Sequence, residues 1–286
     1  MEICEEIGEL FCAEDEKEKT CLRLTYKLIN DNKDLQPMRK FWTNKLALIA
    51  IRSFGCDAHK VIRVMKRLLH SCTMSYPDLF ALINYSKLQP VLDKNIFQII
   101  NTGGNEGCNK SPGMLVLRIN RWNPNEVSLD ELIAVGVLYA YTVIKDSAAI
   151  QRNGGVLIID ADGFNFNHVK VLSFDTVKKM NCLLNTLPIK FVGSVIINSP
   201  KVVEQLFNIF KYVLRAKNRK LIHVVHKNLK PLHDMLPAPD SLPRCFGGKV
   251  DDEIGLLHGV EEFMGDDTTL SRLVEGVQNE YKMRYK

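Results

Sequence analysis

Two segments of the chain have residue types and spacings that could carry chemistry. The stretch Gly104-Asn-Glu-Gly-Cys-Asn-Lys-Ser111 nearly matches a phosphate-binding P-loop, but Asn109 stands where the motif has a glycine before its lysine. Pro112, Gly113 and a β-rich run follow it, instead of the helix whose N-terminus would hold a phosphate. A hairpin turn is the favoured interpretation.

A second candidate is the pair Asp160 and Asp162, which could form a metal site or a general acid and base. No third ligand or partnering histidine is apparent, so a turn at a strand end, with carboxylates bonded to backbone amides, is favoured. His223, His226 and His233 do not have the spacing of a catalytic zinc helix. We therefore expect no enzyme, no metal and no cofactor.

The elements that position these residues are expected to alternate between strands and helices. Nearly continuous aliphatic runs at 156–160, 191–198 and 221–225 are typical of strands covered on both faces, and helical segments separate them. This order predicts an α/β fold with a mostly parallel sheet flanked by helices. Further β-rich runs at 97–100 and 114–119 flank the turn signals of 101–107. One long helix is expected over 130–150, with Ser128 as its N-cap and Glu131 at its third position.

The sequence as a whole is expected to divide into three parts. Residues 1–85 carry apolar residues at helical spacing and are expected to form a small all-helical domain. Residues 90–250 hold the α/β part, and 251–286 are expected to be a partly ordered tail.

Composition and charge narrow the class of protein. With 286 residues and 46% hydrophobic content, the chain can bury a sizeable core, and its eight cysteines include no CxxC pair. The first residues are acidic, where a secretory signal would be basic and apolar, and no run has the length of a membrane span. We expect a soluble, cytoplasmic protein and a monomer.

Charge is segregated along the chain. Residues 2–18 hold eight acids and one lysine, whereas residues 205–233 hold seven Lys or Arg and no acid. Only Tyr212 is aromatic within 211–230, so no stacking platform for nucleic acid is visible. An anionic membrane surface fits this segment better than nucleic acid, although a merely solvated face stays open.

Several segments together resemble the CRAL-TRIO family of lipid-binding proteins, whose members include carriers of tocopherol and retinaldehyde. The resemblance covers most of the chain and rests on Arg118-Ile-Asn-Arg-Trp-Asn-Pro124, Gln151-Arg-Asn-Gly154, Ile159-Asp-Ala-Asp-Gly-Phe-Asn-Phe-Asn-His168, Pro188-Ile-Lys190, Ile196-Ile-Asn-Ser-Pro200, Leu236-Pro237 and Phe246-Gly-Gly248. The family's Leu-Arg-Ala-Arg-like run is reduced here to Arg52. The resemblance implies a CRAL-TRIO lipid-binding domain, in which a mobile lid helix covers one hydrophobic ligand, after a small helical domain.

The resemblance also implies which residues do the binding. The lid would begin at Pro200 and run through the apolar stretch 202–210, which agrees with a composition more apolar than a surface helix needs. The implied pocket contacts are Val137, Leu138, Tyr141, Ile159, Leu172, Leu184, Ile189, Leu206, Phe207 and Phe210. Tyr141 replaces a smaller polar residue of vitamin E binders, so tocopherol is not assumed.

A cationic cleft beside the lid binds phosphoinositide headgroups in the vitamin E carrier. Lys190 and Lys217 match positions of that cleft, whereas Val192 and Leu221 stand at two others. The implied phosphoinositide or membrane set is Lys190, Arg215, Lys217, Arg219 and Lys220.

The sequence thus predicts a non-catalytic carrier that holds one tocopherol-, retinoid- or other isoprenoid-like lipid and transfers it at membranes, with coupling to phosphoinositides. Burial of each methylene contributes about 0.8 kcal/mol, which suffices to hold such a ligand without charge or covalent bonds. Two alternatives stay open: an exchanger of phosphatidylinositol or phosphatidylcholine, and an interaction module that only senses lipid.

Overall fold

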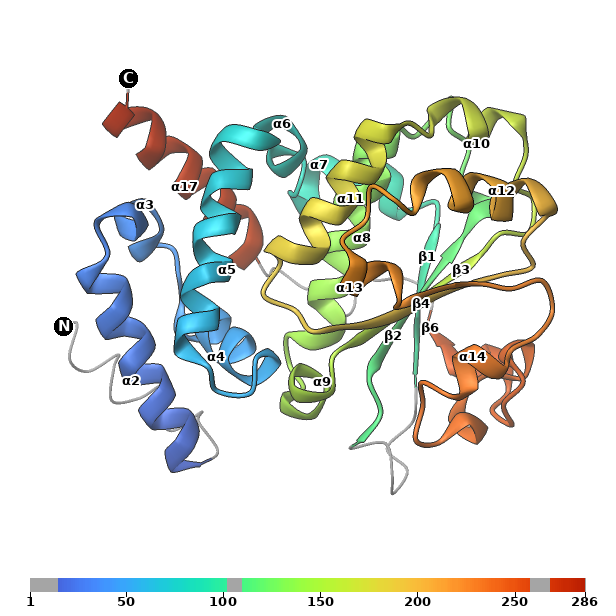
Figure 1. Cartoon of the computed structure of the whole chain (residues 1–286), viewed down its shortest axis with the longest axis horizontal. Coiled ribbons are helices and arrows are strands. Elements are labelled where there is room, and N and C mark those ends of the chain that lie inside the picture. The colour runs from blue at the N-terminus through green and yellow to red at the C-terminus, as the bar shows by residue number, and fades with distance from the viewer. Residues whose placement is uncertain (1–14, 102–109, 258–267, 286) are drawn as a thin grey trace.

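A mixed β-sheet forms the centre of the molecule. The computed structural model describes residues 15–101, 110–257 and 268–285. Within these residues six strands form one sheet in the order β5-β4-β3-β2-β1-β6 (Figure 1). The strands are β1 (Phe97–Ile100), β2 (Gly113–Arg118), β3 (Gly155–Asp160), β4 (Phe191–Ile197), β5 (Ile222–Val224) and β6 (Leu256–Leu257).

The sheet is parallel from β2 to β5 and antiparallel at β1 and β6. In the central register Leu157 lies between Leu115 of β2 and Ser194 of β4, and Ile159 lies between Leu117 and Ile196. The aliphatic runs of the sequence therefore form the strands expected of them, and helical crossovers connect them.

Helices cover the two faces of the sheet unequally (Figure 1). One face carries α8 (Leu129–Ile144), α11 (Phe174–Thr186) and α12 (Lys201–Phe210), with α9 (Ala148–Asn153), α10 (Phe166–Val171) and α13 (Ala216–Arg219) at its margins. The opposite face is covered by 229–246, which includes α14 (Lys230–His233), η5 (Pro239–Ser241) and η6 (Arg244–Phe246). Two short elements complete this part, η4 (Ile119–Arg121) and α15 (Asp252–Gly255).

The helix expected over 130–150 is two helices. Ser128 and Glu131 form the expected capping box at the start of α8. The helix ends at Ile144, however, and Ser147 caps a new helix, α9, by accepting a hydrogen bond from the Ile150 backbone amide. The expectation of one continuous helix was wrong because a serine cap at Ser147 competes with helix continuation.

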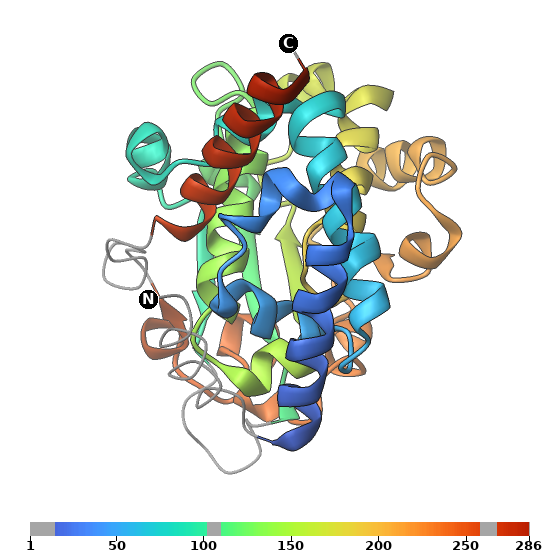
Figure 2. The ribbon, with the colours of Figure 1, turned by 90° about the vertical axis from the view of Figure 1, so that its left-hand side faces the viewer.

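A layer of helices stands beside the sheet domain (Figures 1 and 2). It comprises α2 (Glu16–Asp31), η1 (Lys33–Leu35), α3 (Gln36–Arg39), α4 (Asn44–Ser53), α5 (Ala58–His70), the π-helical turn η2 (Ser71–Ser75), α6 (Pro77–Ala81) and α7 (Tyr85–Leu92). Its apolar faces share one buried cluster with α8, as the helical spacing of the sequence predicts.

The last helix, α17 (Thr269–Tyr285), returns to this layer, where Figure 2 shows it crossing the helices. It packs against α3, η2 and α6 and buries Leu273, Val274 and Val277. The Gln278 side chain donates hydrogen bonds of 2.8 Å to the carbonyls of Cys72 and Pro77. Part of the segment expected to be a tail is thus a packed element of the helical layer.

Buried ionic contacts join the helical layer to the sheet domain. Arg52 of α4 donates to Glu18 of α2 from Nε and Nη2, at 3.0 and 2.9 Å, and from Nη1 to the Gln151 side chain of α9 at 2.9 Å. Glu18 is 2% and Gln151 4% exposed, so the network is shielded from water. Each buried charge is paired and hydrogen-bonded, as burial of charge requires.

Candidate functional site

One face of the parallel sheet is incompletely covered. Along β3, Val156 and Ile158 are 2% and 0% exposed and pack under the segment 229–246. Leu157 and Ile159 point to the opposite face and are only half-buried. The central strands of a parallel sheet are normally buried on both faces. The helical side of this sheet therefore covers its middle strands incompletely, although Leu157 and Ile159 do pack against the large buried cluster of that side.

The same asymmetry continues on the neighbouring strands. In β4, Val195 and Ile197 are buried on the side of α14, whereas Ile196 faces the other way and is half-buried. All three residues of β5 are half-buried. In this register six residues of β3, β4 and β5 share the incompletely covered face, and we call this set the sheet floor. It consists of Leu157, Ile159, Ser194, Ile196, Ile222 and Val224.

Helix α12 lies on the side of this floor and packs against β5 (Figure 1). It begins after Pro200, where the lid was expected to begin. Val203 is its buried residue, while Leu206, Phe207 and Phe210 are half-buried. Such sparse burial is typical of elements with low local stability.

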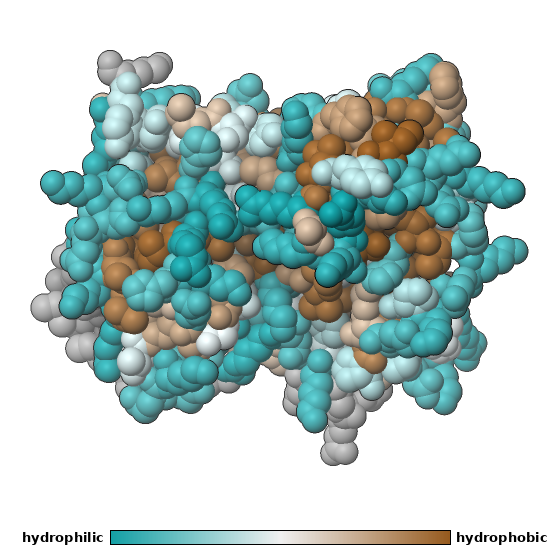
Figure 3. All heavy atoms as spheres, in the orientation of Figure 1, coloured by the Kyte–Doolittle hydropathy of each residue, from teal (hydrophilic) through white to brown (hydrophobic). Residues whose placement is uncertain are grey.

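An aromatic contact connects α12 to α11. The rings of Phe174 and Phe210 meet edge to face with centroids 5.0 Å apart. Phe174 nevertheless leaves 54% of its surface exposed, and Ile209 on the outer side of α12 leaves 55%. Figure 3 shows apolar side chains gathered on the surface around α10, α11 and α12. The exposed large apolar side chains of α10, α11, α12 and the segment just after α12, which we call the exposed apolar patch, are Phe166, Phe174, Met180, Val202, Ile209 and Tyr212.

The implied pocket contacts divide between two places. Ile159 lies on the sheet floor, Leu206, Phe207 and Phe210 lie on α12, and Leu172, Leu184 and Ile189 are half-buried on or next to α10 and α11. These seven residues belong to the elements that surround the floor, and two of them, Ile159 and Ile189, also pack against the large buried cluster.

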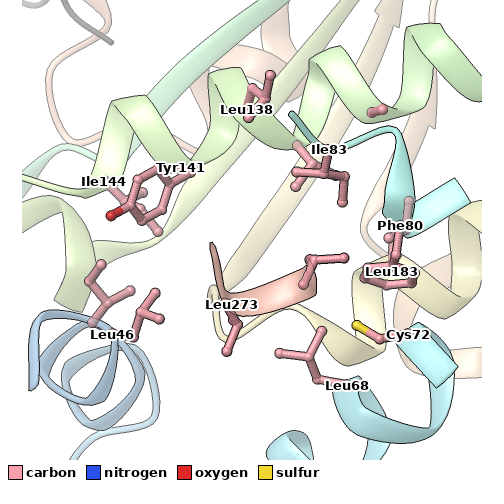
Figure 4. Close-up of a cluster of buried hydrophobic side chains, with 14 of the residues drawn as sticks. Leu46, Leu68, Cys72, Phe80, Ile83, Leu138, Tyr141, Ile144, Leu183 and Leu273 are labelled. Carbon is pink, nitrogen blue, oxygen red and sulfur yellow. The ribbon is translucent and has the colours of Figure 1, made fainter. Parts of the chain in front are cut away.

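The other three contacts lie on α8 and are buried in the large cluster shared with the helical layer. Figure 4 shows Leu138 and Tyr141 in a cluster that also contains Leu46 of α4, Leu273 of α17, and Ile83 from the segment between α6 and α7. Leu138 and Tyr141 also line a cavity of about 20 Å³ with Tyr85 and Leu270. Val137 is 5% exposed in the same cluster. The structure thus places Leu138 and Tyr141 between α8, α7 and α17.

The basic residues gather on the surface around α13. Arg215 donates from Nη1 to the Asn185 side chain at 3.3 Å, and Lys190 donates to the Arg152 carbonyl at 3.2 Å. Arg219 and Lys211 both lie over the ring of Tyr212, at 5.6 and 5.4 Å from its centroid. Cationic side chains therefore adjoin an exposed member of the apolar patch.

Lys217 lies in a surplus of positive charge. Partial burial lowers its pKa, and the cations Arg215, Arg67 and Lys60 lower it further. Arg67 and Lys60 come from α5 of the helical layer, a contribution that the sequence reasoning missed because only tertiary packing brings α5 beside α13. This basic cluster favours a negatively charged partner.

The carboxylates at the ends of the strands have structural partners. Asp160 pairs with Arg118 at 2.6 Å and accepts hydrogen bonds from the Asn198 side chain and the Asp162 backbone amide. This is the expected turn. His226 donates from Nδ1 to the Ser199 carbonyl, and His233 bonds the Phe246 carbonyl. The described ranges contain no cluster of three or more His, Cys, Asp or Glu that could hold a metal. The P-loop-like motif falls largely outside the described residues.

Comparison with known proteins agrees with this architecture. Residues 109–248, which carry β2 to β5 and α12, match the family model of the CRAL/TRIO domain. This part of the chain is therefore assigned to a CRAL/TRIO domain. The chain also aligns over 95% of its length with 99% of the crystal structure of Sfh5, at a TM-score of 0.50 and 10% identity, which supports the fold.

Curated relatives are similar over part of their length. The mouse (Mus musculus) alpha-tocopherol transfer protein-like protein is 29% identical over 182 residues, which are 63% of this chain and 51% of that protein. Clavesin-1 of Xenopus laevis is 30% identical over 136 residues, 47% of this chain and 40% of the relative. The chain spans about half the length of these relatives or less. Among the described residues no helix is long and apolar enough to cross a membrane.

Proposed function

We propose that this chain is a lipid carrier that holds one hydrophobic molecule between the sheet floor and α12 and exchanges it at membranes. The observation that carries the proposal is the half-buried aliphatic face of β3, β4 and β5, which would be unfavourable against water in the middle of a sheet. An apolar ligand that covers this face removes it from water without any need for charge.

The arrangement of α12 suits a lid. Its residues Leu206, Phe207 and Phe210 would meet the ligand, with Ile159 beneath them. The segment before it begins at Asn198, which holds a left-handed backbone with φ of 50°. Movement of a few residues at such a junction lets a helix swing without unfolding the sheet. Leu172, Leu184 and Ile189 would complete the lining from α10 and α11.

The surface around the lid suits a lipid bilayer. The exposed apolar patch adjoins the basic cluster of Arg215, Lys217, Arg219 and Lys220, and Lys190 adds a further exposed cation near α9. Each cation near an anionic leaflet contributes about 1 kcal/mol. Anionic lipids, phosphoinositides included, are therefore the proposed membrane partner. The similarity to an alpha-tocopherol transfer protein-like protein is consistent with lipid handling.

The first test is native mass spectrometry of the purified chain, followed by organic extraction and identification of the bound molecule. A stoichiometric isoprenoid, sterol or retinoid-like lipid supports the carrier. A phospholipid supports instead an exchanger of phosphatidylinositol or phosphatidylcholine. Empty protein that also takes up no hydrophobic probe contradicts carriage and favours an interaction module.

A second test addresses the lid. Phe207→Asp should weaken ligand retention because it places a charge against an apolar cavity. Ile209→Asp is the matched control, since Ile209 lies on the same helix but leaves 55% of its surface exposed. If Phe207→Asp binds the ligand as tightly as both the parent and Ile209→Asp do, Phe207 does not contact the ligand.

A further inference from the structure

An unpaired hydroxyl lies on the sheet floor. Ser194 occupies the middle of β4 between Leu157 of β3 and Ile222 of β5. The residue is 4% exposed, and its Oγ is buried with no hydrogen-bond partner among the described residues. A buried hydroxyl without a partner is unfavourable, and most buried polar side chains are paired.

The strand register fixes the direction of this side chain. Val195 and Ile197 point to the face covered by α14, so Ser194 and Ile196 point to the opposite face. That is the incompletely covered face, and its other described members on β3, β4 and β5 are aliphatic. The hydroxyl is therefore the polar side-chain group of the sheet floor.

Resting on the proposed function, we propose that Ser194 selects lipids that carry a hydrogen-bonding group, such as a hydroxyl or carbonyl, over pure hydrocarbons. The serine hydroxyl both donates and accepts, so it can pair with an alcohol or a carbonyl oxygen. Because Oγ is closed to solvent here, the ligand group reaches it as the neighbouring aliphatic side chains move apart to admit the ligand.

The selectivity follows from the environment of the hydroxyl. A lipid alcohol loses its hydrogen bonds to water when it enters an apolar cavity, and a buried partner restores one of them. Sites that offer a buried polar group discriminate against ligands that leave it unpaired. A bound hydrocarbon would leave the Ser194 hydroxyl without a hydrogen-bond partner, whereas a bound alcohol would form a hydrogen bond with it.

The test compares hexadecanol with hexadecane, which differ by one hydroxyl. Their dissociation constants are measured by displacement of the fluorescent hydrocarbon diphenylhexatriene from the whole chain, for the parent, Ser194→Ala and Ser194→Thr. The ratio of the hexadecanol to the hexadecane constant should rise about fivefold to tenfold in Ser194→Ala. Ser194→Thr, which keeps the hydroxyl, should retain the parental ratio.

The outcomes separate the two proposals. If the parent binds both probes and Ser194→Ala leaves the ratio unchanged, the role of Ser194 is wrong while the carrier stands. If neither diphenylhexatriene nor the two probes bind the parent, both proposals fail. A melting temperature for Ser194→Ala equal to or above that of the parent would exclude misfolding as the cause of a changed ratio.

Discussion

Glu18 and Arg52 face each other across the buried contact between α2 and α4, with Arg52 Nη2 at 2.9 Å from Glu18 Oε2. Their side chains are 2% and 8% exposed, and Arg152 of α9 also pairs with Glu18. The pair therefore belongs to the joint between the helical layer and the sheet domain.

Glu18→Gln should destabilise the fold because it leaves the Arg52 charge buried and uncompensated. Loss of one partner of a buried ion pair costs about 3 to 5 kcal/mol, and urea unfolding followed by circular dichroism measures it. Glu16→Gln is the control, since Glu16 pairs with Lys19 at the surface and should leave the unfolding midpoint nearly unchanged. Similar midpoints for the two variants would contradict the importance of the buried pair.

Phe174→Ala should speed release of bound ligand. The variant removes the edge-to-face contact with Phe210 that holds α12 against α11. Such a contact contributes about 0.5 to 1.5 kcal/mol, which corresponds to release roughly two to ten times faster. Phe166→Ala removes a more exposed ring of the same patch and should leave the release rate unchanged. Stopped-flow loss of a fluorescent lipid provides the measurement.

Replacement of Lys217, Arg219 and Lys220 together by Ala should slow ligand transfer to anionic vesicles but leave ligand affinity intact. The three cations lie on or next to α13, outside the proposed lining. The difference from the parent should shrink as salt screens the charges. Replacement of Lys94, Lys249 and Lys282 removes the same charge elsewhere and serves as the control. Equal transfer by the two triple variants would contradict a dedicated basic cluster.

Gly248→Ala should destabilise the protein. A Cβ at this position would come within 1.9 Å of the Leu242 carbonyl oxygen, which is backbone and cannot move aside. Overpacking of this kind costs about 1 to 3 kcal/mol. Gly155→Ala is the matched control, because its nearest neighbour, the Gly113 carbonyl oxygen, lies 3.8 Å away. Thermal unfolding of both variants compares them, and equal melting temperatures would contradict the clash.

Cys245 should react slowly with iodoacetamide at neutral pH. Although Cys245 is an exposed residue, partial burial of its thiol, followed by the hydrogen bond and charge of Asp252, raises its pKa to about 11. Only the thiolate reacts, so alkylation should accelerate with rising pH until the pH approaches this pKa. Asp252→Asn removes a negative charge and should shift the profile to lower pH. Peptide mass spectrometry follows the labelling, and a plateau below about pH 9 would contradict the raised pKa.

The strands and the family were predictable from the sequence because continuous aliphatic runs such as 156–160 leave little choice but a covered strand. The packing partners of a helix that is apolar on nearly every face could not be predicted in this way. The apolar residues of α8 include Tyr139, whose ring packs at a tilt against Phe97 of the sheet, and Tyr141, which faces Leu46 and Leu273 (Figure 4). Periodicity alone cannot assign such residues to one partner.

The incomplete burial of the sheet floor was likewise not predictable from the sequence. Leu157, Ile196 and Val224 were visible as strand residues, but their incomplete burial depends on where α11 and α12 lie. Ser194 likewise reads as a minor interruption in an aliphatic run. Only the register, which sets it between Leu157 and Ile222, shows that its hydroxyl is isolated.

The return of α17 to the helical layer has a consequence for biosynthesis. Helices α3 and α6 precede the sheet domain in the chain, yet the side chains that cover them, Leu273, Val274 and Val277, come from α17 after it. During synthesis these early helices keep apolar surface uncovered until the sheet domain has been made, so the helical layer cannot finish folding ahead of the rest of the chain. The layer that precedes the sheet in sequence is therefore completed after it in time.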